Sequence, residues 1–326
     1  MTHAIKDNFG YCAACNCNMV NIEKPLYKAT GFNGNNVYHL CSCSKCGVVH
    51  TYPEPSKDEL NQAYNCDYYG GPESKFAYLI ERWTRLNAMI CAKRILKQTN
   101  KPGLPLRILD IGCGRGSLLD AFSCLGHEVA GVERAGSPFS STSYQIYSDI
   151  AELNTQSASY NIIILWHALE HLSNPMVALE EASKFLDESG SLFISVPNFA
   201  SIQARLFKNH WFHLDLPRHL FHFQYNSLCC LLHILDFKII RKSTFCFDQN
   251  IYGFVQSTLN CLPRLNNNHL YNLLKAGRTK KSIYLLVIYF PILVPLMILA
   301  VAELIVSELF GRGATLTIQA VKNSHD

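Results

Sequence analysis

The part of this 326-residue sequence that most constrains its fold is a short apolar strand followed by a glycine-rich turn, at residues 106–116. An apolar helix pattern follows at residues 117–125, and a second strand pattern at residues 127–133. A strand, a glycine-rich turn, a helix and a second strand make one half of a doubly wound α/β sheet. Because ligands of such sheets bind at the carboxyl ends of the strands, the sequence predicts a binding site at this turn.

Five residues in this unit indicate the kind of ligand. Glycine occupies every second position of the turn, at Gly112, Gly114 and Gly116. Glycine has no Cβ, so it allows positive φ angles and lets backbone N–H groups come close to a ligand. Asp110 and Glu133 lie at the tips of the two strands, and a carboxylate at the second tip suits the two hydroxyls of a ribose. The unit therefore predicts a cofactor that contains a nucleoside.

Two cofactor families use such a turn, and the glycine spacing distinguishes them. A dinucleotide-binding turn has the pattern G-x-G-x-x-G, which would require glycine at Ser117. The pattern here, D-x-G-x-G-x-G, resembles motif I of the class I S-adenosylmethionine (SAM) methyltransferases. The resemblance implies that SAM contacts the turn, including Cys113, and that Asp110 helps to hold the amino-acid end of SAM. We therefore favour a methyltransferase over an NAD-dependent oxidoreductase, and over an ordinary glycine-rich turn, which would leave both acidic strand tips unexplained.

The order of motifs over residues 104–250 also resembles this family. The segment at 160–166 is almost entirely apolar, as expected for a parallel strand that is buried on both faces. The resemblance implies that Asp149 and Ile150 border the adenine, with a surface-turn aspartate as the alternative, and that Trp166 and His167 border the cofactor. After the first two, the predicted strands cover residues 144–147, 160–166, 191–196, 237–247 and 314–321. The resemblance implies that the last of them is antiparallel to its neighbour.

Histidines follow the fourth and fifth predicted strands. His171 belongs to the letters HALEHL, which resemble the post-strand motif of many small-molecule methyltransferases. His219 lies with His213 and His222 in an aromatic segment at 211–223, which should lie over the acceptor side of the cleft. Because methyl transfer to oxygen usually needs a base, His171 and His219 are the catalytic candidates. The alternative is aromatic packing with solvated histidines, and the histidine spacing is poor for a metal site on one element.

Two C-x-x-C pairs near the N-terminus predict a zinc site. The pairs are Cys12–Cys15 and Cys43–Cys46, and their separation suits a tetrahedral Zn²⁺. Four thiolates leave no open coordination position, so the predicted zinc is structural. Cys17 or Cys41 could replace a neighbour as ligand, and plain buried thiols are the alternative to a metal. A redox pair is disfavoured because no thioredoxin-like βαβ unit surrounds either motif.

Residues 53–103 predict a linker and a lid over the cofactor. A turn-forming segment precedes a short helix at 57–64, and apolar residues recur at helical spacing over 74–99. The resemblance implies that the long helix covers the SAM site. Tyr68 and Tyr69 are candidate lid residues, with ordinary packing as the alternative.

An uncharged apolar run at 283–302 predicts membrane association, because its length permits a membrane span. A single crossing would place the last strand on the wrong side of the membrane for joining the sheet. Two prolines within the run permit a kinked or re-entrant dip instead. Basic residues precede it and fit a cytoplasmic leaflet; they are Lys275, Arg278, Lys280 and Lys281. The alternative is a helical pair packed on the protein or on a partner subunit.

Composition agrees with a membrane-associated enzyme. Hydrophobic residues make up 48% and charged residues 17% of the chain, which is low in charge for a purely soluble enzyme. A net charge of +4 gives no nucleic-acid footprint. The N-terminus lacks the apolar core of a secretion signal, so we expect a reducing, cytoplasmic location at the inner face of the membrane.

The sequence therefore predicts a Rossmann-like α/β methyltransferase with a seven-stranded sheet, a zinc-ribbon-like head and a hydrophobic helical insertion before the last strand. The expected acceptor is a small molecule at the membrane, first a sugar or lipid-linked glycan and second a quinone-like lipid. The alternatives are a membrane-tethered SAM-binding protein with an inactive core, and an oxidoreductase. Nothing in the sequence specifies an oligomeric state. The predicted units are 1–52 (head), 53–103 (linker and lid), 104–250 (core), 251–312 (insertion) and 313–326 (last strand).

Overall fold

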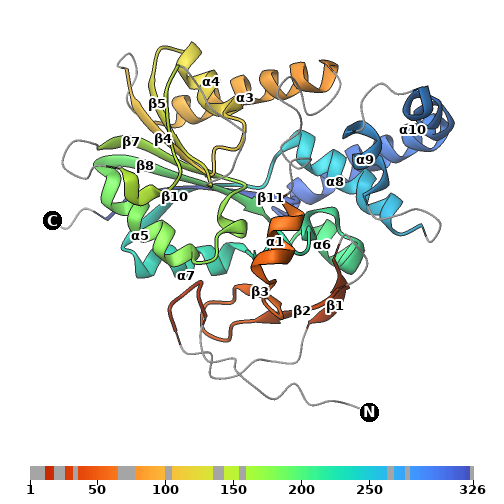
Figure 1. Cartoon of the computed structure of the whole chain (residues 1–326), viewed down its shortest axis with the longest axis horizontal. Helices are drawn as coiled ribbons and strands as arrows, with labels where there is room; N and C mark the ends of the chain where they lie inside the picture. The colour runs from red at the N-terminus through yellow and green to blue at the C-terminus, as the bar shows by residue number, and fades with distance from the viewer. Residues whose placement is uncertain are drawn as a thin grey trace.

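The computed structural model describes residues 12–17, 26–31, 36–64, 78–99, 105–134, 143–153, 159–262, 268–275 and 280–323. These residues form a large mixed sheet covered by helices, a small N-terminal sheet and a group of helices that extends to one side (Figure 1). The predicted lid residues Tyr68 and Tyr69 lie outside the described residues.

The large sheet has the strand order β10-β11-β8-β7-β4-β5-β6. β4 pairs in parallel with β5 and β7, whereas β11 runs antiparallel to both β8 and β10. The predicted seven-stranded sheet with an antiparallel last strand is confirmed. Its strands are β4 (Arg107–Ile111), β5 (Glu128–Val132), β6 (Gln145–Tyr147), β7 (Tyr160–Trp166), β8 (Leu186–Pro197), β10 (Phe237–Ser243) and β11 (Thr315–Lys322).

Helices cover both faces of the large sheet, with α3 and α4 on one face and α5 and α7 on the other (Figure 1). On the first face, Ala92 of α3 and Phe122 of α4 pack with Ile164 of β7. On the second face, Leu179 of α5 and Leu231 of α7 belong to the largest apolar cluster. The helices are α3 (Tyr78–Gln98), α4 (Ser117–Cys124), α5 (Pro175–Phe185) and α7 (Tyr225–Ile234).

The small sheet joins the N-terminal head to the core. Its strand order is β1-β2-β3-β9, and β9 comes from the segment that follows β8 by more than twenty residues. β3 pairs with β9 in the antiparallel sense, with Val49 opposite His222 and His50 opposite Phe221. The head therefore shares its sheet with the core. The strands are β1 (Tyr27–Thr30), β2 (Val37–Ser42), β3 (Val49–Tyr52) and β9 (Phe221–His222).

Short helices place the loops around the carboxyl ends of the large sheet. α1 follows the head directly, and a capping box between Ser56 and Glu59 fixes its start. Asn174 caps α5 by accepting a hydrogen bond from the Val177 N–H at 3.2 Å. The short helices are α1 (Lys57–Ala63), η1 (Ile150–Glu152), η2 (Leu169–His171), α6 (Ile202–Phe207), η3 (Lys208–His210) and η4 (Phe212–Leu214).

Three helices extend together from one side of the sheet (Figure 1). They are α8 (Phe247–Asn260), α9 (His269–Lys275) and α10 (Lys280–Leu309). α10 continues through Pro291 and Pro295, so the apolar run forms one helix rather than a re-entrant turn or a helical pair. A proline removes a helical hydrogen bond and can kink a helix without ending it.

Two strand boundaries differ from the prediction by more than one residue. β8 begins at Leu186 rather than Ser191, because a register shift opposite Tyr160 to Ile162 accommodates the intervening residues. Asp187 accepts a hydrogen bond from the Ser189 N–H at 2.9 Å within this irregular segment. β10 ends at Ser243, four residues earlier than predicted, because the chain leaves the sheet to begin α8.

Candidate functional site

The glycine-rich turn is held at the carboxyl ends of β4 and β5. The N–H groups of Gly112 and Cys113 donate to the Val132 carbonyl at 2.7 and 3.1 Å. A Cβ on Gly112 would lie 2.5 Å from the Cβ of Ala168, whereas a Cβ on Gly114 would have no atom within 4 Å. The φ angles at Gly112, Gly114 and Gly116 are +77°, +56° and +72°, so the backbone needs glycine at all three turn positions. Open space faces Gly114, the middle one.

A cavity of about 770 Å³ opens beside this turn. We call it the first cavity, and its volume is in the range of small-molecule sites. It brings together all the predicted cofactor-binding residues except Asp110 and Gly116. Those that line it are Gly112, Cys113, Gly114, Glu133, Asp149, Ile150, Trp166 and His167.

The two predicted acidic contacts in the first cavity already have backbone partners. The Gly114 N–H donates to Glu133 Oε2 at 2.7 Å, so the second strand tip reaches across to the turn. Asp149 Oδ1 accepts from the Ala151 N–H at 2.9 Å and caps η1. Asp149 therefore caps the start of η1 and also lines the first cavity. The sequence analysis gave a surface-turn aspartate and a cofactor-site residue as alternatives, and the position of Asp149 is compatible with both.

Asp110 is a buried carboxyl group beside the turn. It is 3% exposed, and its Oδ1 has no hydrogen-bond partner among the described residues. Burial raises the pKa of Asp110 to about 7, and the charge of Glu133 adds to the effect. An unpartnered acid at a cavity wall fits a cationic ligand group such as an ammonium.

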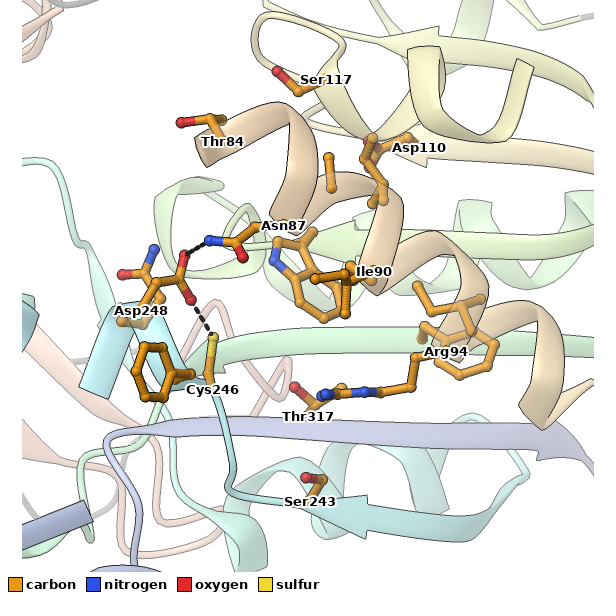
Figure 2. A pocket seen from close by; sticks show the side chains of 18 of the residues that line it. Thr84, Asn87, Ile90, Arg94, Asp110, Ser117, Ser243, Cys246, Asp248 and Thr317 are labelled. Atoms are coloured by element: carbon orange, nitrogen blue, oxygen red, sulfur yellow. Dashed lines mark hydrogen bonds between the residues drawn. The ribbon is translucent and has the colours of Figure 1, made fainter. Parts of the chain in front are cut away.

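Asp110 faces a second cavity, of about 560 Å³, between α3 and the sheet (Figure 2). The second cavity shares Gly112, Cys113 and Trp166 with the first, so the two adjoin at the glycine-rich turn. On the side away from the turn, Asn87 of α3 donates to Asp248 Oδ2 of α8 at 3.2 Å. The sequence analysis did not predict this cavity, because its walls come from segments that are far apart in the chain.

The two candidate bases differ in their access to the first cavity. His171 lines it, and its Nδ1 lies 2.9 Å from the Tyr64 hydroxyl. His219 lines neither cavity and lies behind His171, with ring centroids 4.5 Å apart. Burial lowers the pKa of His219 to about 4, and the nearby His171 contributes, so the His219 imidazole is neutral at pH 7.

The other histidines of the aromatic segment are also buried, so the expectation that they lie over the cleft is wrong. His222 Nε2 lies 3.1 Å from Thr51 Oγ1 of β3. His213 Nε2 lies 3.2 Å from the Gln249 carbonyl in α8. The pairing of β3 with β9 draws this segment inward, where hydrogen bonds hold it between the head and α8.

Glu170 is a buried carboxylate that the sequence analysis did not single out. It is 1% exposed, and neither of its oxygens has a hydrogen-bond partner among the described residues. Its carboxylate and the ring nitrogens of His171 and His219 lie within 4.8 Å of one another, and His167 Nδ1 is 3.4 Å away. The only sequence signal was an acid within an otherwise apolar and histidine-rich segment.

The sequence analysis also missed the contribution of the first linker helix. Lys57, Leu60 and Tyr64 of this region line the first cavity. The guanidinium of Arg134, next to Glu133 in the chain, lies 4.3 Å from the centroid of the Tyr64 ring. A solitary tyrosine at a helix end gave no signal for this long-range contact.

The four predicted zinc ligands are brought together and buried. The Sγ atoms of Cys12 and Cys46 are 3.8 Å apart, and those of Cys15 and Cys43 are 3.9 Å apart. Four thiolates at Zn–S distances of about 2.3 Å have sulfur–sulfur separations of about 3.8 Å at tetrahedral geometry. The hydrogen bond with Cys46 lowers the pKa of Cys12, and so does His50, whose Nε2 lies 3.1 Å from the Cys12 Sγ. Together they outweigh burial, which raises this pKa. The sulfur positions fit a tetrahedral metal.

Two similar turns present these cysteines. Asn16 follows Cys15 and Gly47 follows Cys46, with positive φ angles of 53° and 72°. These positions reverse the chain after each pair. Cys17 lies beside the cluster and accepts a hydrogen bond from Lys45 Nζ at 3.3 Å, so it does not replace a neighbour.

Comparison with known proteins identifies the part of the chain that runs from α3 to β10. Residues 83–242 match the sequence family described as "Methyltransferase domain". These residues form a methyltransferase domain. Together with the strand order, the match confirms the predicted class I methyltransferase core.

Several relatives of the methyltransferase domain carry the name ubiquinone biosynthesis O-methyltransferase. The protein of Xanthomonas campestris pv. campestris is 26% identical over 157 residues, covering 42% of this chain and 65% of its own length. That of Chelativorans sp. is 30% identical over 108 residues, covering 30% of this chain and 43% of its own length. The chain thus spans less than two thirds of these relatives.

Solved structures with related folds were also found. A SAM-dependent methyltransferase from Archaeoglobus fulgidus has 19% identity and a TM-score of 0.44, covering 75% of this chain and 99% of its own. The 1,6-didemethyltoxoflavin-N1-methyltransferase of Burkholderia thailandensis has 19% identity and a TM-score of 0.42, covering 63% and 87%.

Proposed function

We propose that this protein is a SAM-dependent methyltransferase that acts on a small-molecule acceptor at a membrane surface. The observation that carries the proposal is the turn at Gly114, whose open side faces the first cavity. Glu133 lines this cavity, and Asp110, on the adjacent strand tip, lines the second cavity that adjoins it at the turn. SAM, when bound, supplies the electrophilic methyl group, so the protein mainly has to align the reactants and exclude water.

Each residue around the turn has a distinct part in holding the cofactor. The Glu133 carboxylate would exchange its Gly114 hydrogen bond for the ribose hydroxyls. The buried Asp110 carboxylate would hold the ammonium group, and Asp149 with Ile150 would border the adenine. A titration calorimetry experiment tests this assignment, since SAM should bind and NAD should not. Binding of NAD instead would favour the oxidoreductase alternative.

The raised pKa of Asp110 predicts that SAM affinity depends on pH. Near its pKa of about 7 the free protein begins to protonate this carboxyl, whereas a bound ammonium group requires the charged form. Affinity should therefore fall as the pH drops below 7, by about tenfold per pH unit well below the pKa. Calorimetry between about pH 5.5 and pH 8 measures this effect. The Asp110→Asn variant should bind weakly with a flatter profile, and an equal slope in both proteins would contradict the assignment.

An acceptor hydroxyl would need a base, and His171 is better placed for that role than His219. His171 reaches the first cavity, and its Nδ1 lies 2.9 Å from the Tyr64 hydroxyl and 3.1 Å from the Arg218 carbonyl. An Nδ1–H that donates to this carbonyl leaves Nε2 free to accept a proton. His219 is a supporting neighbour, because its Nδ1 donates to the His213 carbonyl at 2.9 Å and its ring packs on His171. The sugar-like or lipid-linked acceptor and the quinone-like lipid remain the two acceptor classes, and the name of the relatives favours O-methylation.

α10 supports the membrane part of the proposal. Its span Phe290–Leu309 has a mean hydropathy of 2.3 and is only 17% buried, unlike the core helix of a soluble protein. The two acids of this span turn toward the protein, where Glu303 accepts from Gln203 and Glu308 accepts from Thr244. The exposed side is left apolar, with Phe290, Ile292, Val294, Met297, Ile298, Leu299, Val301, Ile305, Val306 and Leu309.

A charge on the exposed side of α10 should release the protein from membranes. Ile298 is 66% exposed, and a lysine in its place should weaken binding to vesicles of anionic phospholipid by at least about tenfold, because a buried charge costs about 2.5–3.5 kcal/mol at the bilayer centre. Flotation of the full chain with vesicles measures the effect. Ile234→Lys is the matched control, since Ile234 is 52% exposed on α7, away from α10. Equal flotation of both variants would favour packing of α10 on a protein partner.

The cysteine cluster would hold one structural Zn²⁺ through Cys12, Cys15, Cys43 and Cys46. The sulfur–sulfur separations of 3.8 and 3.9 Å support this metal and number of ligands. A closed set of four thiolates leaves no position for an acceptor, so the metal would stabilise the head rather than take part in methyl transfer.

A further inference from the structure

The second cavity extends from the cofactor turn to the surface of the protein. Its inner end holds Asp110, next to the turn (Figure 2). Trp166 also belongs to this end, because it lines both cavities. Its walls beyond this point include the apolar side chains of Ile95, Leu118 and Phe193. If the adenosine part of SAM occupies the first cavity, the outer part of the second cavity remains free and leads directly to the reacting centre.

Exposed apolar side chains border the opening of the second cavity, which we call its rim. Trp83 and Ile90 of α3 are each 47% exposed, and Phe245 and Phe247 are 40% and 49% exposed. The guanidinium of Arg94 lies 5.9 Å from the Phe245 ring centroid and adds positive charge at this rim. A rim of aromatic and aliphatic groups with a nearby cation suits an amphiphile whose chain passes inward.

This rim adjoins the end of α10. Thr244 Oγ1 donates to Glu308 Oε1 at 2.9 Å, which ties the segment before Phe245 to the last turn of α10. The residues that follow Glu308, Leu309 and Phe310, are 80% and 70% exposed. The apolar surface of α10 and the rim of the second cavity are therefore neighbours. If α10 contacts a bilayer, the cavity opens close to it.

We propose that the second cavity admits the apolar chain of an acceptor that is drawn from the bilayer, with the methyl-accepting head at the turn shared by the two cavities. The proposal rests on the proposed methyltransferase function and assigns its acceptor to the lipids. Its alternatives are a water-soluble acceptor in the same cavity, and contact between the rim and a bilayer without chain entry.

Tryptophan quenching by brominated lipids tests the proposal in the full chain. The protein has three tryptophans: Trp83 at the rim, Trp166 at the inner end and Trp211, which is 2% exposed. Phosphatidylglycerol vesicles with brominated acyl chains should quench both Trp83 and Trp166, relative to vesicles without bromine. Comparison of the wild type with Trp83→Phe and Trp166→Phe separates the two signals. The double variant Phe245→Asp and Phe247→Asp should lose Trp166 quenching, whereas Ile234→Asp should retain it.

The outcomes separate this proposal from the proposed function. Quenching of Trp83 without Trp166 would overturn the proposal, because the bilayer would then touch the rim only. Absence of all quenching, or unchanged Trp166 quenching in the rim variant, would also overturn it. SAM binding by calorimetry on the same samples reports on the cofactor site alone. Quenched tryptophans in a protein that does not bind SAM would contradict the methyltransferase function. SAM binding without quenching of Trp166 would contradict only the lipid acceptor.

Discussion

Replacing Gly114 with valine should abolish SAM binding while leaving the protein folded. The Cβ of a residue at this position would meet no protein atom within 4 Å and would project into the first cavity. The valine side chain would therefore occupy the space through which the backbone approaches the cofactor. We expect the SAM dissociation constant to rise at least about 100-fold, or about 2.8 kcal/mol, by calorimetry.

Gly126 provides a matched control for this substitution. Its φ angle is +85°, a Cβ there would also have no atom within 4 Å, and it lines neither cavity. Gly126→Val thus imposes similar backbone strain, on the order of 1–2 kcal/mol, away from the site. It should lower the melting temperature about as much as Gly114→Val and leave SAM affinity unchanged. Near-normal affinity in folded Gly114→Val would refute the assignment of the turn.

Replacing Cys43 with serine should remove the metal and unfold the head. Structural zinc contributes about 10–16 kcal/mol to the folding of zinc-finger peptides, so loss of one ligand should lower the melting temperature by about 10 °C. Metal analysis under reducing conditions should find one Zn²⁺ in the wild type and none in the variant. SAM affinity should change little, because the glycine-rich turn lies on the other sheet.

Cys17→Ser is the control for the zinc experiment. Its thiol lies beside the cluster but outside the set of four, so the variant should retain one Zn²⁺ and its melting temperature. A wild-type protein without zinc would leave the cluster as buried thiols. Loss of zinc from Cys17→Ser together with its retention in Cys43→Ser would show that the ligand set is different.

The cofactor turn could be predicted from the sequence because its signals are local. Glycine at every second position, an acid at each strand tip and an apolar helix all lie within residues 106–133. Gly112 and Gly114 have the positive φ angles that the pattern indicated, and the open space at Gly114 leaves room for the predicted ligand. The apolar strand segments, together with the resemblance to a known family, similarly predicted seven strands with the last one antiparallel.

The features that were missed depend on contacts between distant segments. Thr51 Oγ1 donates to the His219 carbonyl at 2.7 Å, across 168 positions of the chain. This pairing of the head with β9 buries histidines that the sequence placed over the cleft. The second cavity needs α3, β10 and the start of α8 together, and no spacing within one segment indicates it. A run of apolar residues with two prolines likewise gave no means to distinguish one long helix from a re-entrant pair.

The most direct measurement of the central claim is transfer of a labelled methyl group. The full chain would be incubated with SAM carrying a deuterated methyl group and with a membrane-lipid extract, and the products analysed by mass spectrometry. The account predicts a labelled product in the lipid fraction with the wild type and with Gly126→Val, and none with Gly114→Val. A protein that binds SAM but labels no product, or equal labelling by Gly114→Val, would contradict it.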